Sequence, residues 1–232
     1  MTVDYFHIDI NNRIVFSSNI QPEDPSACST PSGCPIRAIL DPLGVGQILF
    51  FTNAVDTRTQ GLDIVLLYDI HFGRGSLLTL EGAMNFNKTE VTDRHSPSTI
   101  LPAEVLFDQA QVTLVEEAQP KQHHTFSGTY YRGPWTANLR LNYFGKVAGE
   151  GFTPGFKQVW SGKWLTDASI GYEFKNGVSF MFGGLNIFNI YPDKWDPEKA
   201  FPFPQLGFVY GWETVPFGIN GASYYVRAGY HF

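Results

Sequence analysis

Apolar and polar side chains alternate along much of this chain. The clearest example, residues 135–145, has apolar Trp135, Ala137, Leu139, Leu141 and Tyr143 alternating with polar Thr136, Asn138, Arg140 and Asn142. A helix would scatter these residues around its axis, whereas successive side chains of a strand point to opposite faces. Similar alternation predicts about eight strands, around residues 6–10, 62–69, 78–87, 126–130, 135–145, 167–174, 180–182 and 223–232.

The links between these segments alternate in length. Short links that contain glycine fall at residues 71–76, 132–134 and 175–177, and long links fall at 18–46, 88–120, 146–162 and 191–221. This rhythm is typical of outer-membrane barrels, which have tight periplasmic turns and long extracellular loops. We therefore predict an all-β, antiparallel, up-and-down transmembrane β-barrel segment of about eight strands. One short helix is expected within residues 104–117, in a loop.

Composition and charge support this prediction. Charged residues make up only 16% of the chain, against about a quarter in ordinary globular domains. No stretch approaches the roughly 20 consecutive apolar residues of a membrane helix. A barrel in the bacterial outer membrane explains both facts, because its strands present an apolar side chain at every second position. The net charge of −6 and the scattered basic residues argue against a nucleic-acid partner.

Aromatic residues gather near the predicted short links and the end of the chain. They are Tyr68, Phe72, Tyr130, Tyr131, Trp135, Tyr172, Phe174, Tyr230 and Phe232. Aromatic rings favour the membrane interface, so we expect a belt level with the periplasmic turns.

Five segments resemble the TonB-dependent outer-membrane receptors. They are VDYFHIDINNRI (3–14), TRTQGLDIVLLY (57–68), WLTDASIGYEF (164–174), FGGLNIFN (182–189) and YYVRAGYHF (224–232). The resemblance implies a barrel of about 22 strands, plugged by an N-terminal domain. Residues 1–232 would then be the C-terminal β-barrel portion, the last eight strands, without the plug domain and the TonB-binding segment. Because no export signal precedes the alternation that follows Met1, we expect a longer protein.

The resemblance also implies a function. Such receptors take up a scarce nutrient, namely a ferric siderophore, haem, cobalamin or a carbohydrate. The implied partners are outer-membrane lipid, the barrel-assembly machinery, a small nutrient ligand, and TonB only through the N-terminal region. Tyr230 and Phe232 would form the C-terminal assembly signal. Two alternatives stay open: an independent eight-stranded barrel acting as an adhesin or small pore, and a secreted soluble β-sandwich that binds carbohydrate.

No catalytic motif, cofactor or metal site is predicted, and the chain is not expected to be an enzyme. The polar residues expected to face the barrel lumen are Asp63, Glu81, Asn85, Asn138, Arg140, Asp167, Glu173 and Arg227. These residues either solvate the interior and pair with the plug or touch a passing substrate. The loop aromatics proposed as ligand contacts are Trp160, Trp195, Tyr210 and Trp212, and packing among the loop aromatics, which include Phe152, Phe156, Phe201 and Phe203, is the alternative. Cys28 and Cys34, six residues apart in a turn-rich segment, are a candidate disulfide.

Overall fold

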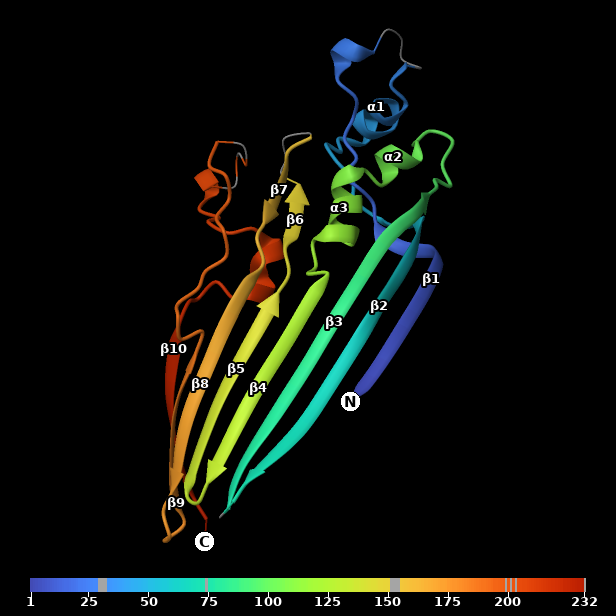
Figure 1. Ribbon diagram of the computed structural model, residues 1–232. Helices are drawn as coiled ribbons and strands as arrows, with labels where there is room; N and C mark the ends of the chain where they lie inside the picture. Colours follow the sequence, from blue (N-terminus) through green and yellow to red (C-terminus); the bar gives the residue numbers. More distant parts are fainter. Residues whose placement is uncertain are drawn as a thin grey trace. The chain divides into compact units, whose positions relative to one another are not determined.

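A computed structural model describes residues 1–28, 33–73, 75–150, 155–198, 200, 202 and 204–231. Eight strands form one antiparallel sheet in which neighbours follow the order of the chain (Figure 1). They are β1 (Thr2–Phe16), β2 (Phe51–Phe72), β3 (Ser76–Arg94), β4 (Gln122–Arg132), β5 (Trp135–Phe144), β8 (Lys163–Glu173), β9 (Val178–Leu185) and β10 (Ser223–Tyr230). The predicted all-β fold with eight strands is confirmed.

The sheet is open. Its order runs from β1 at one edge to β10 at the other, and within the described ranges no strand pairing joins these two edges. The sheet is therefore not the closed eight-stranded barrel of the adhesin or pore alternative. Over the part of the chain that the structure describes, a second sheet contains only β6 (Val147–Glu150) and β7 (Lys157–Trp160), too little to form the other half of a β-sandwich.

The predicted short links are confirmed as tight turns after β2, β4 and β8. Each contains a glycine with positive φ, at +83° for Gly75, +55° for Gly133 and +83° for Gly177. Glycine adopts this conformation at little cost because it has no Cβ.

The long links differ in detail from the prediction. The strand predicted at 78–87 continues to Arg94, and the strand predicted at 62–69 begins at Phe51. The expected helix within 104–117 is two helices, α2 (Ala103–Leu106) and α3 (Gln109–Glu117). They are separate because the Asp108 side chain accepts a hydrogen bond from the backbone N–H of Gln111 at 3.0 Å and starts a new helix.

The remaining helical segments were not predicted. They are α1 (Pro35–Leu40), η1 (Pro25–Ala27), η3 (Asp41–Leu43), η4 (Pro204–Leu206) and η5 (Trp212–Phe217). No helix among the described residues is long and apolar enough to cross a membrane.

The chain divides into two compact units. Unit 1 contains residues 1–6, 61–88 and 117–232, and unit 2 contains residues 7–60 and 89–116. The core of unit 1 consists of Val147, Trp160, Trp195, Ala200 and Phe217. The core of unit 2 consists of Ile20, Ala54, Val55, Leu106, Phe107 and Val112. Buried side chains thus gather mainly in and next to the long links.

Candidate functional site

One face of the sheet carries a row of polar side chains. Glu81 of β3 lies opposite Ser127 of β4, Ser127 lies opposite Arg140 of β5, and Arg140 lies opposite Asp167 of β8. Residues directly opposite one another in an antiparallel pair share a face. The Ser127 hydroxyl donates a hydrogen bond to Glu81 Oε2 at 2.8 Å. The four side chains therefore form one continuous row across four strands.

Further hydrogen bonds extend this polar face. Asn85 Nδ2 donates to Asp63 Oδ1 at 2.6 Å, and Asn138 Nδ2 donates to Thr129 Oγ1 at 2.8 Å. Asn142 Nδ2 donates to Asp167 Oδ2 at 3.3 Å. Most of the predicted lumen residues thus already have partners within the sheet, which favours a structural and solvating role for them.

The last two predicted lumen residues share this face nearer the tight turns. Glu173 lies opposite Ser179, and Arg227 lies opposite Met181. All eight predicted residues are therefore on one face of the sheet. That this face lines a lumen stays a prediction.

The opposite face of the sheet is apolar and exposed. Leu139, Phe182 and Val226 are 50%, 55% and 71% exposed on β5, β9 and β10. Large apolar patches are rarely left in water by soluble proteins. This face has the character of a surface that contacts lipid.

Two groups of aromatic side chains border the apolar face. Near the tight turns, Trp135 packs edge-on against Tyr172 with ring centroids 4.7 Å apart; that these rings form a belt at the membrane interface stays a prediction. Near the long links, Tyr143 and Trp164 lie 4.9 Å apart, and Tyr143 stacks on His124 at 5.5 Å. The sequence analysis did not predict the second group. Its signal was nevertheless present, because Tyr143 shares the face of Trp135 on β5 and Trp164 shares the face of Tyr172 on β8. Tyr131 is an exception in the predicted belt, because its register places it opposite Thr136 on the polar face.

The segment FGGLNIFN contains the end of β9 and the asparagine-rich turn that follows it. Asn186 and Asn189 have positive φ values of 49° and 56°. The Asn186 side chain donates to the Ile190 carbonyl at 2.7 Å and accepts from the Ile190 N–H at 2.9 Å. The backbone N–H of Asn186 donates to Asp167 Oδ1 at 2.9 Å. Asp167 is thus a positioning residue that fixes the start of the link between β9 and β10.

Two of the predicted ligand contacts are buried instead. Trp160 and Trp195 are 0% and 4% exposed, and their rings pack edge-on with centroids 4.6 Å apart. Neither ring offers a face to a ligand, so the prediction of ligand contact does not fit these two. Packing within the loops, the alternative left open by the sequence, is what the structure contains at this place.

The other two, Tyr210 and Trp212, lie beside a hollow in the link between β9 and β10. Trp212 is 52% exposed and packs against Phe208 with ring centroids 5.4 Å apart, while Tyr210 stacks on Tyr191 at 6.3 Å. The hollow has a volume of about 330 Å³, and its lining is Gly207, Phe208, Val209, Tyr210, Gly211, Trp212, Val215 and Ile219. Phe208, which the sequence did not single out, belongs to the same surface. The role of Tyr210 and Trp212 in ligand binding stays a prediction.

Some predicted residues lie outside the described part of the chain. These are Phe152, Phe201, Phe203 and Phe232. Tyr230, the other half of the proposed assembly signal, is 62% exposed on β10.

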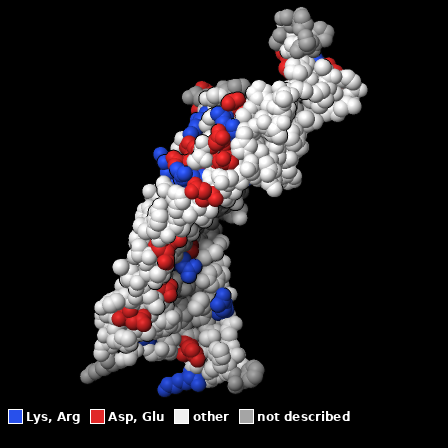
Figure 2. Space-filling view, turned by 90° about the vertical axis from the view of Figure 1, so that its right-hand side faces the viewer, with Lys and Arg blue, Asp and Glu red and all other residues white. Residues whose placement is uncertain are grey.

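Charged groups hold the long links of unit 1 in place. Lys163 Nζ donates to Asp193 Oδ1 at 2.6 Å, and the Ser161 N–H donates to Asp193 Oδ2 at 2.8 Å. Partial burial opposes the charge on Asp193, but these hydrogen bonds outweigh it and lower the pKa of this carboxyl. Glu213 behaves in the opposite way, since burial raises its pKa. In Figure 2, basic and acidic side chains are interspersed in patches, and broad stretches of the visible surface carry neither.

A disulfide joins Cys28 and Cys34 across a Cα–Cα distance of 5.6 Å. Beside it, the Glu23 carboxylate accepts hydrogen bonds from the N–H groups of Ile36 at 3.0 Å and Arg37 at 2.7 Å. Arg37 also pairs with Asp41 at 2.8 Å. The disulfide and these contacts stabilise the segment that contains α1.

Comparisons with known proteins agree with this architecture. No curated protein matches the sequence. The chain is similar in structure to "Ferric-Catecholate import receptor Fiu from K12 E. coli", with a TM-score of 0.57 and 14% sequence identity. This similarity covers 99% of the chain and 25% of Fiu, so the chain spans about a quarter of that receptor. A family model described as "TonB dependent receptor-like, beta-barrel" matches residues 1–189, and the chain therefore belongs to this family of outer-membrane receptors.

Proposed function

We propose that the chain supplies the C-terminal strands of a TonB-dependent receptor barrel, which takes up a scarce nutrient through the outer membrane. The observation that carries this proposal is the open eight-stranded sheet, with one hydrogen-bonded polar face and one exposed apolar face. In hydrocarbon, each unpaired backbone group at a sheet edge costs several kcal/mol. The edges at β1 and β10 therefore need further strands, which the rest of a larger barrel supplies.

In this arrangement residues 1–232 are barrel only. The plug domain and the TonB-binding segment belong to the remainder of the receptor, and TonB contacts the receptor through that region. Outer-membrane lipid covers the apolar face, and the barrel-assembly machinery recognises the final strand with Tyr230 and Phe232. The polar residues of the inner face solvate the lumen and contact the plug. The chain has a transport role and no catalytic one.

Ferric siderophores are the first substrate class to test. Fiu is named a ferric-catecholate import receptor, and catecholate rings stack well on aromatic side chains. In this chain, exposed Phe208 and Trp212 border the hollow of about 330 Å³. Haem, cobalamin and carbohydrates are the other classes that the family resemblance implies.

An uptake assay tests the proposal. Cells that lack other ferric-siderophore receptors would express the complete receptor, and uptake of a radioactive ferric catecholate would be measured at several concentrations. We expect saturable uptake that needs TonB. Trp212→Ala should weaken the apparent affinity by about tenfold, the usual effect of truncating an aromatic anchor.

Leu206→Ala is the matched control. Leu206 is 65% exposed in the same link but does not line the hollow, so its replacement should leave uptake unchanged. If the receptor took up haem, cobalamin or a sugar and not the ferric catecholate, the assignment of ferric siderophores as the substrate class would be wrong. Absence of any TonB-dependent uptake, from a receptor found folded in the outer membrane, would contradict the proposed function itself.

A further inference from the structure

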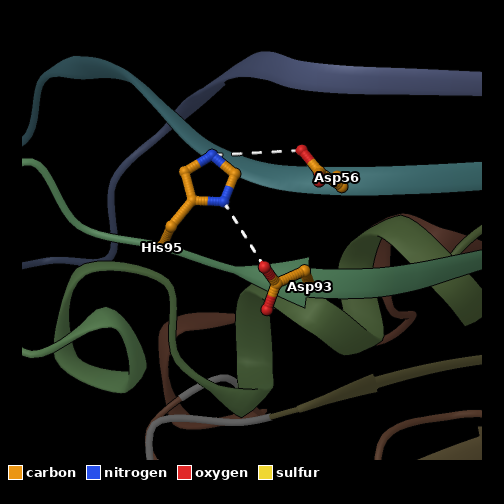
Figure 3. A group of neighbouring side chains, drawn as sticks. All are labelled: Asp56, Asp93 and His95. Atoms are coloured by element: carbon orange, nitrogen blue, oxygen red, sulfur yellow. Dashed lines mark ion pairs between the residues drawn. The ribbon is translucent and has the colours of Figure 1, made fainter.

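Three side chains that can bind metal ions converge in unit 2. Asp56 comes from β2, Asp93 comes from β3, and His95 follows the end of β3 (Figure 3). His95 Nε2 lies 4.0 Å from Asp56 Oδ1, and His95 Nδ1 lies 4.0 Å from Asp93 Oδ2. One ligand atom from each residue can be chosen so that all lie within 4.8 Å of one another.

The contacts within this cluster are too long to be hydrogen bonds, which need about 2.7–3.2 Å between nitrogen and oxygen. His95 Nε2 is nevertheless buried and has no hydrogen-bond partner in the described part of the protein. Over the same residues, neither aspartate forms an ion pair with a lysine or arginine. The imidazole and the two carboxylates therefore lie beside one another without a hydrogen bond between them.

The backbone holds these side chains where they are. Asp56 Oδ1 accepts a hydrogen bond from the Asn12 N–H at 2.8 Å. Asp93 Oδ1 accepts one from the Arg94 N–H at 2.9 Å, which leaves Oδ2 facing His95. The Arg94 side chain points elsewhere and donates to the Phe107 carbonyl at 3.1 Å. The His95 N–H donates to the Ala54 carbonyl at 2.9 Å. The cluster is thus positioned before any ion arrives.

We propose that Asp56, Asp93 and His95 bind a divalent transition-metal ion such as Zn²⁺, with water completing its coordination. Zinc bonds of about 2.0–2.2 Å place two ligand atoms of one ion about 3–4 Å apart. One ligand atom from each of the three residues already lies within 4.8 Å of the other two, so the side chains need to move closer together to bind one ion. A histidine nitrogen with two carboxylate oxygens favours Zn²⁺ over Ca²⁺, which prefers oxygen ligands alone. One ring nitrogen binds the ion, and the other keeps its proton.

Such an ion would connect three parts of unit 2. It would join β2, β3 and the first residue of the link 95–121, next to the core that contains Ala54 and Val55. The site would therefore stabilise this link independently of nutrient uptake.

Calorimetric titration of Zn²⁺ into the purified receptor in detergent tests the proposal. We expect one ion per chain in this site, loss of that binding in His95→Ala, and at least tenfold weaker binding in Asp93→Asn. Asp93 is 70% exposed, so its replacement by asparagine should not impair folding. A tenfold excess of Ca²⁺ should not displace Zn²⁺. Binding should weaken at acidic pH, because metal ligands must be deprotonated.

His71→Ala and Asp4→Asn are matched controls, since both residues are exposed and lie outside the cluster. They should bind Zn²⁺ as the unaltered receptor does. The proposal would be overturned if the unaltered receptor failed to bind Zn²⁺. It would also be overturned if His95→Ala and Asp93→Asn bound Zn²⁺ as tightly as the unaltered receptor does. Neither result would bear on the uptake assay.

Discussion

Replacing Trp160 with alanine should open the core of unit 1 without disturbing the sheet. Trp160 is 0% exposed, and its ring packs edge-on against Trp195. The backbone at Gly211 lies so close to the Trp160 ring that a Cβ at this position would collide with it. The surrounding segments therefore fit closely around the indole and would not refill the space it leaves.

The size of the effect follows from this burial. Truncation of a buried Trp or Phe to alanine costs about 3–5 kcal/mol. At about 1.4 kcal/mol per factor of ten, local opening of β6, β7 and the link 186–222 should become roughly a hundred to several thousand times more frequent. The strands pair through the backbone, so β5 and β8 should keep their protection.

Hydrogen exchange measured by mass spectrometry reports this opening segment by segment. We expect faster exchange in residues 147–160 and 204–217 and unchanged exchange in β5. Trp212→Ala is the matched control, because Trp212 is 52% exposed and its loss should alter exchange little. Equal effects of the two replacements, or faster exchange throughout the sheet, would refute the reasoning.

Three further predictions concern single features of the fold. Burial raises the pKa of Glu213 in the folded protein. The folded link therefore loses stability as the pH rises above the pKa that Glu213 has in the unfolded chain, because the carboxyl then ionises in a buried place. Glu213→Gln should therefore increase protease resistance near neutral pH and have no effect in acid, and a gain in acid would contradict this. Replacement of both Cys28 and Cys34 by serine should remove about 2 kcal/mol of local stability, seen as faster proteolysis within residues 23–41; reductant should have the same effect on the unaltered protein and none on the variant. Gly177→Ala should lower the folded fraction on a heat-modifiability gel, because φ is +83° and a Cβ would meet the His231 carbonyl, at a cost of about 1–2 kcal/mol. Gly73→Ala, where a Cβ meets nothing within 4 Å, should fold normally.

The strands were predictable because an apolar face and a polar face on opposite sides of the sheet leave a strict period of two in the sequence. β5 is the best example, with Trp135 to Phe144 in the structure against the predicted 135–145. The ends of β2 and β3 were missed because polar residues occupy both faces there, as in Thr57, Arg58 and Thr59. Without alternation, only the pairing of the chain with distant segments identifies a strand.

The sequence predicted on which face of the sheet each polar residue lies, but it did not predict which of these residues contact one another. Alternation placed Asn138 and Arg140 on one side of β5, and the register then fixed Asp167 opposite Arg140. Sequence alone could not place the Asn186 N–H on Asp167, because this contact depends on the register between β8 and β9 and on the turn that follows β9. The same holds for Asp56 and His95, which are distant in sequence and meet only because β2 and β3 are neighbours.

The central claim is that one face of this sheet meets lipid and the other meets water. Cysteines introduced singly at residues 138, 139, 140 and 141 of the receptor in membranes would test it directly, since Cys28 and Cys34 are already joined in a disulfide. A water-soluble maleimide should label Asn138→Cys and Arg140→Cys and should spare Leu139→Cys and Leu141→Cys. Uniform labelling of all four positions, or labelling of the leucine positions alone, would contradict the account.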